Sequence, residues 1–433
     1  MMIDLIAVGA GPKGVAVAAK AAVMEHLGLP APSVLLVDPL GVGGHWRAHG
    51  GWTDGQHRLG TPPEKDVGFP YRTRIAGEES HRVDEELARH GWAAFLIARG
   101  EFGAWIDRGR PAPRHEQWAD YLGWVVERLG IEVLEATVTS AELRHNEQGG
   151  HSEQGEHWEV ETTAGSLHAK SLMPTGPGAS TRRLAEVPGV YSLAQFWQLC
   201  AEEGIKKGVD IAVIGSGESS ASVVEQVAYS RAGSVTVISP SAAIYTRGEG
   251  QFENRLYTDP HRWVALDEPA RRDILARTDR SVYSVRIQQR EGMDERLDHV
   301  RGTVSTVRPA NDKLQVEYRR SQPEGEHTGS VLADVVVDAR GNSPLWFGEY
   351  LAPDTRERLA REAGAEGWAS ISVEQVERRI DGTLRFEGLG GRLFMPTLAG
   401  LMQGPGFANL SCLGELSNRI IAGVKGMENS EQK

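Results

Sequence analysis

Two glycine-rich turns are the residues of this chain whose type and spacing most directly predict chemistry. The first turn contains Gly9, Gly11, Pro12 and Gly14. In a GxGxxG turn, the first glycine permits a tight bend, the second lets the backbone approach a pyrophosphate, and the third allows close helix–strand packing. Free N–H groups at the start of the following helix then face the phosphates. This turn therefore predicts a bound dinucleotide.

The segments around the first turn have the pattern that such a site needs. An apolar run at Ile3–Val8 predicts a buried strand, and Val15–Ala22 is rich in helix-forming residues. A second apolar run, Ser33–Val37, ends in Asp38. An acid at the end of the second strand is where a ribose hydroxyl is bound. The alternative for Asp38 is a turn residue without a ligand.

The second turn follows another apolar run, Val209–Ile214. Ser220, a small residue that still allows close packing, stands where the third glycine would be. The candidate cofactor contacts of this turn are Gly215, Gly217, Glu218, Ser219 and Ser220.

The next strand, Ser234–Ile238, ends in Ser239 rather than in an acid. Without a carboxylate there to repel a 2′-phosphate, NADPH is favoured over NADH. Arg231 and Arg247 are candidate phosphate partners, although solvated surface arginines are common.

Two such units in one chain favour a flavoprotein, because hydride must pass between two bound dinucleotides. We therefore predict an α/β fold with two Rossmann-like domains, one for FAD and one for NADPH. Apolar runs ending at Leu172–Gly176 and Asp334–Gly341 indicate where the chain passes between them. The expected division is a discontinuous FAD-binding domain at 1–188 and 344–433, and an NADPH-binding domain at 189–343.

Composition excludes several other classes of protein. Lys plus Arg is 47 and Asp plus Glu is 59, a formal charge of 47 − 59 = −12, which disfavours nucleic acid as a partner. Only Cys200 and Cys412 occur, so a disulfide framework and a thiolate metal site are not expected. No stretch is apolar enough for a membrane span or a signal peptide. We expect a cytoplasmic protein with no metal site, and we interpret His45, His49 and His57 as loop histidines.

Four stretches carry a resemblance to a known family, the flavin-dependent N-hydroxylating monooxygenases, which are the lysine and ornithine hydroxylases of siderophore biosynthesis. Each motif is loose, but their order and spacing match, and they extend over nearly the whole chain. The stretches are Arg114–Trp124, Gly217–Ala221, Gln251–Pro260 and Asn409–Leu413.

The resemblance implies roles for particular residues. Leu59 would pack near the isoalloxazine, Lys65 would contact the substrate carboxylate, and Asn254 would bind substrate. Ser411 would lie close to both substrate and flavin, and Trp46 is expected to contact the cofactor. The resemblance also places a small helical substrate region at 255–292. Taken alone, Lys65 would be read as an exposed loop lysine.

The implied reaction needs no acid or base from a side chain. NADPH reduces FAD, and a C4a-hydroperoxyflavin formed with O2 passes oxygen to the primary amine of a free amino acid, lysine or ornithine. The amine must be neutral to react, and its reference pKa is about 10.4. We therefore expect an activity optimum above neutral pH. The family often forms tetramers, so a homo-oligomer is compatible with the resemblance.

Departures from the family pattern leave the substrate open. Val282 stands where an Asn normally precedes Tyr-Ser-Val, and Leu59-Gly60 replaces a Met-Gln pair. Two amide contacts of the usual ornithine site are therefore missing. Arg58 and Arg280 flank these positions, and either would suit an acidic substrate such as aspartate. A non-oxygenating NADPH:flavin reductase is a further alternative.

Overall fold

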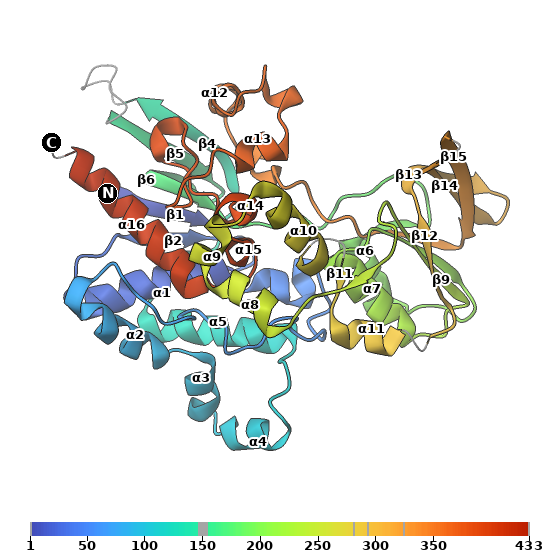
Figure 1. The fold of residues 1–433 in the computed structure, drawn as a ribbon, viewed down its shortest axis with the longest axis horizontal. Helices are drawn as coiled ribbons and strands as arrows, with labels where there is room; N and C mark the ends of the chain where they lie inside the picture. Colours follow the sequence, from blue (N-terminus) through green and yellow to red (C-terminus); the bar gives the residue numbers. More distant parts are fainter. Residues whose placement is uncertain (1, 146–154, 280–281, 292–293, 324, 432–433) are drawn as a thin grey trace.

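Two β-sheets, one mixed and one parallel, form the two halves of the protein (Figure 1). The computed structural model describes residues 2–145, 155–279, 282–291, 294–323 and 325–431. The first sheet has the strand order β3-β2-β1-β6-β5-β4, in which β3, β2, β1 and β6 pair in parallel and β5 pairs antiparallel with both β6 and β4. These strands are Ile3–Val8 (β1), Val34–Val37 (β2), Val133–Leu134 (β3), Val138–His145 (β4), Glu156–Thr162 (β5) and Gly165–Pro174 (β6).

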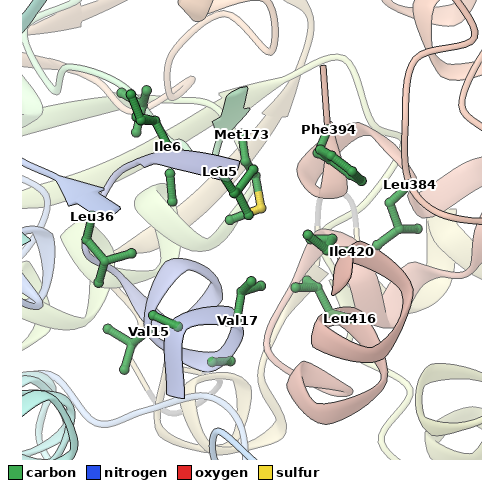
Figure 2. Packing of buried hydrophobic residues seen from close by; sticks show 14 of the residues in the cluster. Leu5, Ile6, Val15, Val17, Leu36, Met173, Leu384, Phe394, Leu416 and Ile420 are labelled. Atoms are coloured by element: carbon green, nitrogen blue, oxygen red, sulfur yellow. The ribbon is translucent and has the colours of Figure 1, made fainter. Parts of the chain in front are cut away.

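Helices from both ends of the chain cover the first sheet. α1 (Pro12–His26) packs against α16 (Leu413–Glu431), so the C-terminal segment completes a core that the N-terminal segment begins. Figure 2 shows Val17 of α1 between Leu5 of β1 and Leu416 of α16. The remaining helices of this half are α2 (Ser80–Ala88), α3 (Trp92–Ala98), α4 (Phe102–Asp107), α5 (His115–Leu129), α12 (Pro353–Glu362) and α13 (Val373–Glu377).

The second sheet is parallel throughout and has the order β12-β9-β8-β16-β7. α6 (Leu193–Glu202) and α7 (Glu218–Ala228) cover one face, and a three-stranded antiparallel sheet covers the other. The parallel strands are Val190–Ser192 (β7), Asp210–Ile214 (β8), Ser234–Ser239 (β9), Leu297–Arg301 (β12) and Val335–Asp338 (β16). The covering strands are Thr303–Ala310 (β13), Lys313–Gln322 (β14) and Gly325–Ala333 (β15).

A helical layer lies between the two halves. α8 (Gln251–Thr258), α9 (Pro260–Val264) and α10 (Glu268–Thr278) pack against α14 (Gly400–Gln403) and α15 (Pro405–Ala408), around the buried Trp263. The next helix, α11 (Val285–Glu291), packs instead on α7 of the second half. β10 (Tyr245–Thr246) and β11 (Val282–Tyr283) form a short parallel pair that contacts α10 of this layer. None of the helices in the described ranges is long and apolar enough to cross a membrane.

Candidate active site

The first glycine turn has the form of a pyrophosphate cradle. Gly9 has φ of +120°, and a Cβ there would overlap the side chain of Thr175. A Cβ on Gly14 would overlap the Gly9 carbonyl, so α1 approaches β1 closely only because Gly14 has no side chain. Gly11, the residue before α1, is different: it has an extended backbone (φ −83°, ψ −173°) and no atom within 4 Å of a built Cβ. The fold itself does not require glycine there, and the open space fits the pyrophosphate of a dinucleotide.

The other predicted contacts of the first cradle lie around it. Asp38 ends β2 and is buried, and its two oxygens accept hydrogen bonds from the Ala10 N–H (3.0 Å) and the Leu40 N–H (2.9 Å). Asp38 thus holds the turn together, and a carboxylate with about four lone-pair sites can still accept a ribose hydroxyl. Trp46 lies in the following loop, and its ring meets His115 edge-on at 4.8 Å.

The second glycine turn repeats the geometry of the first. Gly215 has φ of +117°, and a Cβ there would lie 2.8 Å from the Ala339 carbonyl oxygen. Gly217, directly before α7, has no atom within 4 Å of a built Cβ. Ser220 is fully buried, and its hydroxyl lies 2.7 Å from the Tyr283 hydroxyl. Both turns therefore combine a first glycine that has no room for a Cβ, a buried small residue at the third position, and a middle glycine whose space is open to a ligand.

The second cradle lies beside the loop of the first half that carries Leu59. Glu218, the first residue of α7, forms an ion pair with Arg247 at 2.6 Å. A Cβ built on Gly60 would be 3.2 Å from Glu218 Oε1 and 3.3 Å from an Arg247 nitrogen. Arg247 therefore faces Glu218 and Gly60. At the end of β9, the Ser239 hydroxyl lies 3.0 Å from His299 Nε2.

Two of the three residues predicted to lie at the substrate, Lys65 and Asn254, are in direct contact. Lys65 Nζ donates a hydrogen bond of 2.9 Å to Asn254 Oδ1, although 189 positions separate them in the sequence. The Asn254 amide nitrogen donates in turn to the Glu249 carbonyl at 2.7 Å. Burial lowers the pKa of Lys65, and Cys412 and Glu249 oppose that shift. The first half contributes the lysine and α8 contributes the amide.

A buried carboxylate holds the loop that presents Lys65. Asp66 accepts hydrogen bonds from the Tyr71 hydroxyl (2.7 Å) and from the N–H groups of Trp92 (2.8 Å) and Gly68 (3.2 Å). Burial raises the pKa of Asp66 to about 6, and these hydrogen bonds oppose the rise. The position of Lys65 therefore depends on its neighbour rather than on regular secondary structure.

Ser411 lies on a segment that contacts the first cradle. Ser411 is buried before α16, and its N–H donates to Asn409 Oδ1 at 2.8 Å. Lys13, inside the first glycine turn, donates from Nζ to the Ala408 carbonyl at 2.9 Å, and burial lowers its pKa to about 8. Our sequence analysis missed Lys13, although a lysine within a glycine turn was a usable signal. The segment around Ser411 is thus tied to the first cradle.

A pocket of about 470 Å³ lies between the loop that carries Leu59 and the segments that carry Glu249 and Arg286. Leu59, which is buried, and the residues up to Glu64 form one wall, while Glu249, Ser284 and Arg286 form another. The pocket therefore has walls from both halves of the chain, next to the Lys65–Asn254 pair.

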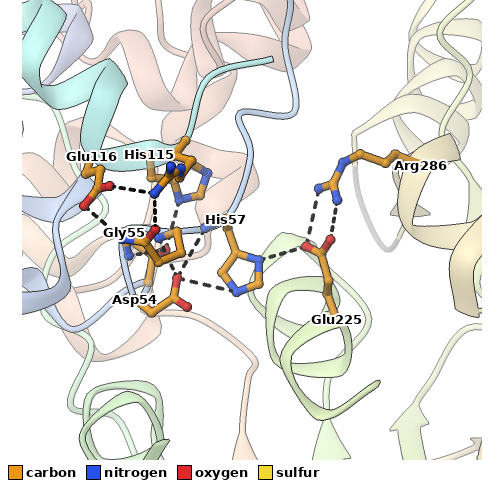
Figure 3. Close-up of polar contacts among 10 residues, drawn as sticks. Asp54, Gly55, His57, His115, Glu116, Glu225 and Arg286 are labelled. Atoms are coloured by element: carbon orange, nitrogen blue, oxygen red, sulfur yellow. Dashed lines mark hydrogen bonds and ion pairs between the residues drawn. The ribbon is translucent and has the colours of Figure 1, made fainter. Parts of the chain in front are cut away.

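A polar network joins the two halves beside this pocket (Figure 3). His57 Nδ1 lies 2.8 Å from an oxygen of Glu225 on α7, and Arg286 on α11 forms an ion pair with the same carboxylate. Burial alone raises the pKa of Glu225, but the bonds from His57 and Arg286 outweigh it and lower the pKa to about 2. Beside it, burial and nearby positive charge lower the pKa of His115 to about 3. Sequence reasoning did not find this network, because its members lie far apart along the chain.

The departures from the family pattern are also visible. Val282 is 1% exposed, so it offers the pocket no polar contact. Arg58 is exposed and donates to the Ala112 carbonyl at 2.6 Å, and it does not line the pocket. Arg280 lies outside the described residues. Within the part of the chain that the structure describes, no three His, Cys, Asp or Glu side chains converge as metal ligands.

Two Rossmann-type cradles in one chain, together with a pocket whose walls come from both halves, define a class of protein, the two-dinucleotide oxidoreductases. A family model described as L-lysine 6-monooxygenase/L-ornithine 5-monooxygenase matches residues 87–342. The chain belongs to this family, and it is an N-hydroxylating monooxygenase.

Individual relatives agree with this assignment. The chain is 42% identical to L-lysine N6-monooxygenase MbtG of Mycobacterium sp. (strain MCS), over 98% of this chain and 96% of that protein. It is also 42% identical to MbtG of Mycobacterium tuberculosis (strain ATCC 25618 / H37Rv), over 97% and 95% respectively. The solved structure of lysine monooxygenase NbtG from Nocardia farcinica superposes with a TM-score of 0.84 at 40% identity, covering 97% of this chain and all (100%) of NbtG.

Proposed function

We propose that the protein hydroxylates the terminal amine of free L-lysine, using FAD and NADPH. The observation that carries this proposal is the Lys65–Asn254 hydrogen bond of 2.9 Å beside a pocket with walls from both halves of the chain. A cation and an amide at this point suit the α-carboxylate of an amino acid. The relatives that are 42% identical to this chain are named L-lysine N6-monooxygenases. This similarity supports lysine rather than ornithine as the proposed substrate.

Each part of the site has a role in this proposal. Gly9 and Gly14 shape the first cradle, Gly11 leaves room there for the pyrophosphate of FAD, and Gly217 before α7 leaves room for that of NADPH. Bound FAD, once reduced by NADPH, supplies the oxygen-activating chemistry. Lys65 and Asn254 hold the α-carboxylate. We assign 1–188 and 344–433 to the FAD-binding domain and 189–343 to the NADPH-binding domain.

The remaining contacts complete the site. Leu59 and Ser411 lie near the flavin, with Ser411 also near the substrate. Trp46 and Asp38 contact FAD, whereas Glu218, Ser219 and Arg247 contact NADPH. The predicted contact Ser220 is fully buried, and it supports the turn instead. In the overall reaction, the amine gains one oxygen atom of O2, the other leaves as water, and NADPH is oxidised.

The experiment that tests the function is product analysis with separate amino acids. FAD-loaded protein is given NADPH and O2 with L-lysine, L-ornithine, L-aspartate or no amino acid, and products are identified by mass spectrometry. We expect one added oxygen on L-lysine, with ornithine much poorer. Oxidation of aspartate alone would contradict the proposal, as would NADPH consumption without any oxidised amino acid, which is the behaviour of a reductase.

The activity is expected to depend on pH through two groups with opposite effects. Turnover should rise above neutral pH, because a growing fraction of the substrate amine is neutral. The pKa of Lys65 lies below its ordinary value of 10.5, so Lys65 loses its charge earlier than a free lysine and KM should rise at high pH. The measurement is kcat and KM between about pH 6 and pH 10, around the reference lysine pKa.

The variant Lys65→Arg separates these two effects. A guanidinium stays charged over the whole range, so the alkaline rise of KM should shrink in this variant while the rise of kcat remains. A flat kcat profile between pH 6 and 9, or an identical alkaline rise of KM in wild type and variant, would contradict this explanation.

A further inference from the structure

Glu249 is an acidic residue beside the substrate pair to which the proposed function assigns no role. It follows β10 and lines the pocket, where its side chain is exposed. Its backbone carbonyl accepts the 2.7 Å hydrogen bond from Asn254, whose oxygen in turn accepts the bond from Lys65. Glu249, Asn254 and Lys65 are therefore consecutive members of one chain of contacts at the pocket.

The charged groups around the pocket differ in whether they already have partners. Arg247 is paired with Glu218, and Arg286 is paired with Glu225. Within the described ranges, the Glu249 carboxylate has neither an ion pair nor a hydrogen bond. Lys65 is bonded only to a neutral amide there. Glu249 in the lining and Lys65 beside it are thus a negative and a positive group without an ion pair in the described ranges. Glu64 and Arg110 also line the pocket without an ion pair there, but neither belongs to the chain of contacts through Asn254.

Lys65 and Glu249 are close enough for the charge of each to affect the pKa of the other. The charge of Glu249 raises the pKa of Lys65, against the burial that lowers it. Partial burial raises the pKa of Glu249, while Arg247 and Lys65 oppose that rise. Glu64 also lines the pocket, but its charge is not among those that shift the pKa of Lys65.

A free amino acid carries the complementary pair of charges, a carboxylate and an ammonium group on the same carbon atom. We propose that the Glu249 carboxylate binds the α-ammonium group of the substrate while Lys65 and Asn254 bind its α-carboxylate. Glu249 is then a specificity-determining residue that selects substrates with a free α-amine. The buried Val282 cannot supply such a contact. This inference rests on the proposed function.

The test compares substrates that differ only in the α-amine. L-lysine and 6-aminohexanoate have the same chain and carboxylate, but the second has no α-amine. In the Glu249→Gln variant, the Kd and KM for L-lysine should rise about 10- to 100-fold, the range for losing a charge-assisted hydrogen bond. The values for 6-aminohexanoate should change less than about twofold, which is clearly smaller than the effect expected for L-lysine. Glu249→Asp, which keeps the charge, should lie between wild type and Glu249→Gln.

Calorimetric titration of the oxidised, FAD-loaded protein measures Kd without turnover. The control is Glu253→Gln, an acid on α8 that does not line the pocket, and its Kd for L-lysine should equal that of the wild type. Equal losses for both substrates in Glu249→Gln would overturn the proposal, as would loss of lysine binding in Glu64→Gln instead. Failure of the proposed function looks different, because wild type itself would then neither bind nor oxidise L-lysine.

Discussion

Replacing Lys65 with alanine is expected to lower kcat/KM for L-lysine by at least about 30-fold. Truncating one partner of a buried, hydrogen-bonded charge pair costs about 2–5 kcal/mol, and the lower end of that range gives this factor. Lys65 donates to Asn254 at 2.9 Å and is the proposed cation for the α-carboxylate. The loss should appear mainly as a higher KM, because the lysine binds a part of the substrate that does not react.

Three measurements make this prediction specific. Reduction of FAD by NADPH without substrate should be unchanged in Lys65→Ala, because the two cradles do not include Lys65. The double variant Lys65→Ala/Asn254→Ala should lose less than the sum of the single losses, since contacting residues are coupled. Lys206→Ala, which removes an exposed lysine between α6 and β8, should behave like wild type. An equal KM for lysine in Lys65→Ala and wild type would remove Lys65 from the substrate site.

Replacing Gly11 with valine should give a folded protein that has lost FAD. The backbone at Gly11 is extended and a built Cβ meets no atom within 4 Å, so the fold accommodates a side chain. A side chain there would occupy the space of the pyrophosphate. Inserting a group into a filled site costs about 1–3 kcal/mol, so FAD affinity should fall about 10- to 100-fold. Flavin absorbance after purification and FAD titration of the apoprotein measure this loss.

The second cradle and the third glycine provide matched controls for this prediction. Gly217→Val should keep FAD but raise KM for NADPH, because the same open space lies on the other sheet. Gly14→Val should instead destabilise the fold, because its Cβ would overlap the Gly9 carbonyl. If Gly11→Val retained FAD at wild-type affinity, the open space at Gly11 would not be the pyrophosphate site.

Both cradles were predictable from local sequence. The strands expected at Ile3–Val8 and Val209–Ile214 are found at Ile3–Val8 and Asp210–Ile214. Strand, turn and helix in a Rossmann unit are adjacent in the chain, and their periodicity and glycine spacing are local properties. The predictions of the fold class and of the family used such local sequence patterns, and the comparisons confirm the family.

The substrate side of the site was decided by the tertiary structure. Lys65, Asn254 and Glu249 lie on different segments, and no local pattern records that they are in contact. The same is true of His57 and Glu225, which join the two halves across 168 positions.

The sequence by itself therefore determined that two dinucleotides are bound, which family the chain belongs to, and which residues are candidates for the substrate. Only the tertiary structure decided that Arg247 faces Glu218 and that Glu249 lines the pocket with no opposite charge bound to it in the described ranges. The reason is physical. Backbone propensity and side-chain periodicity act over a few residues, whereas the pairing of charges depends on how distant segments pack.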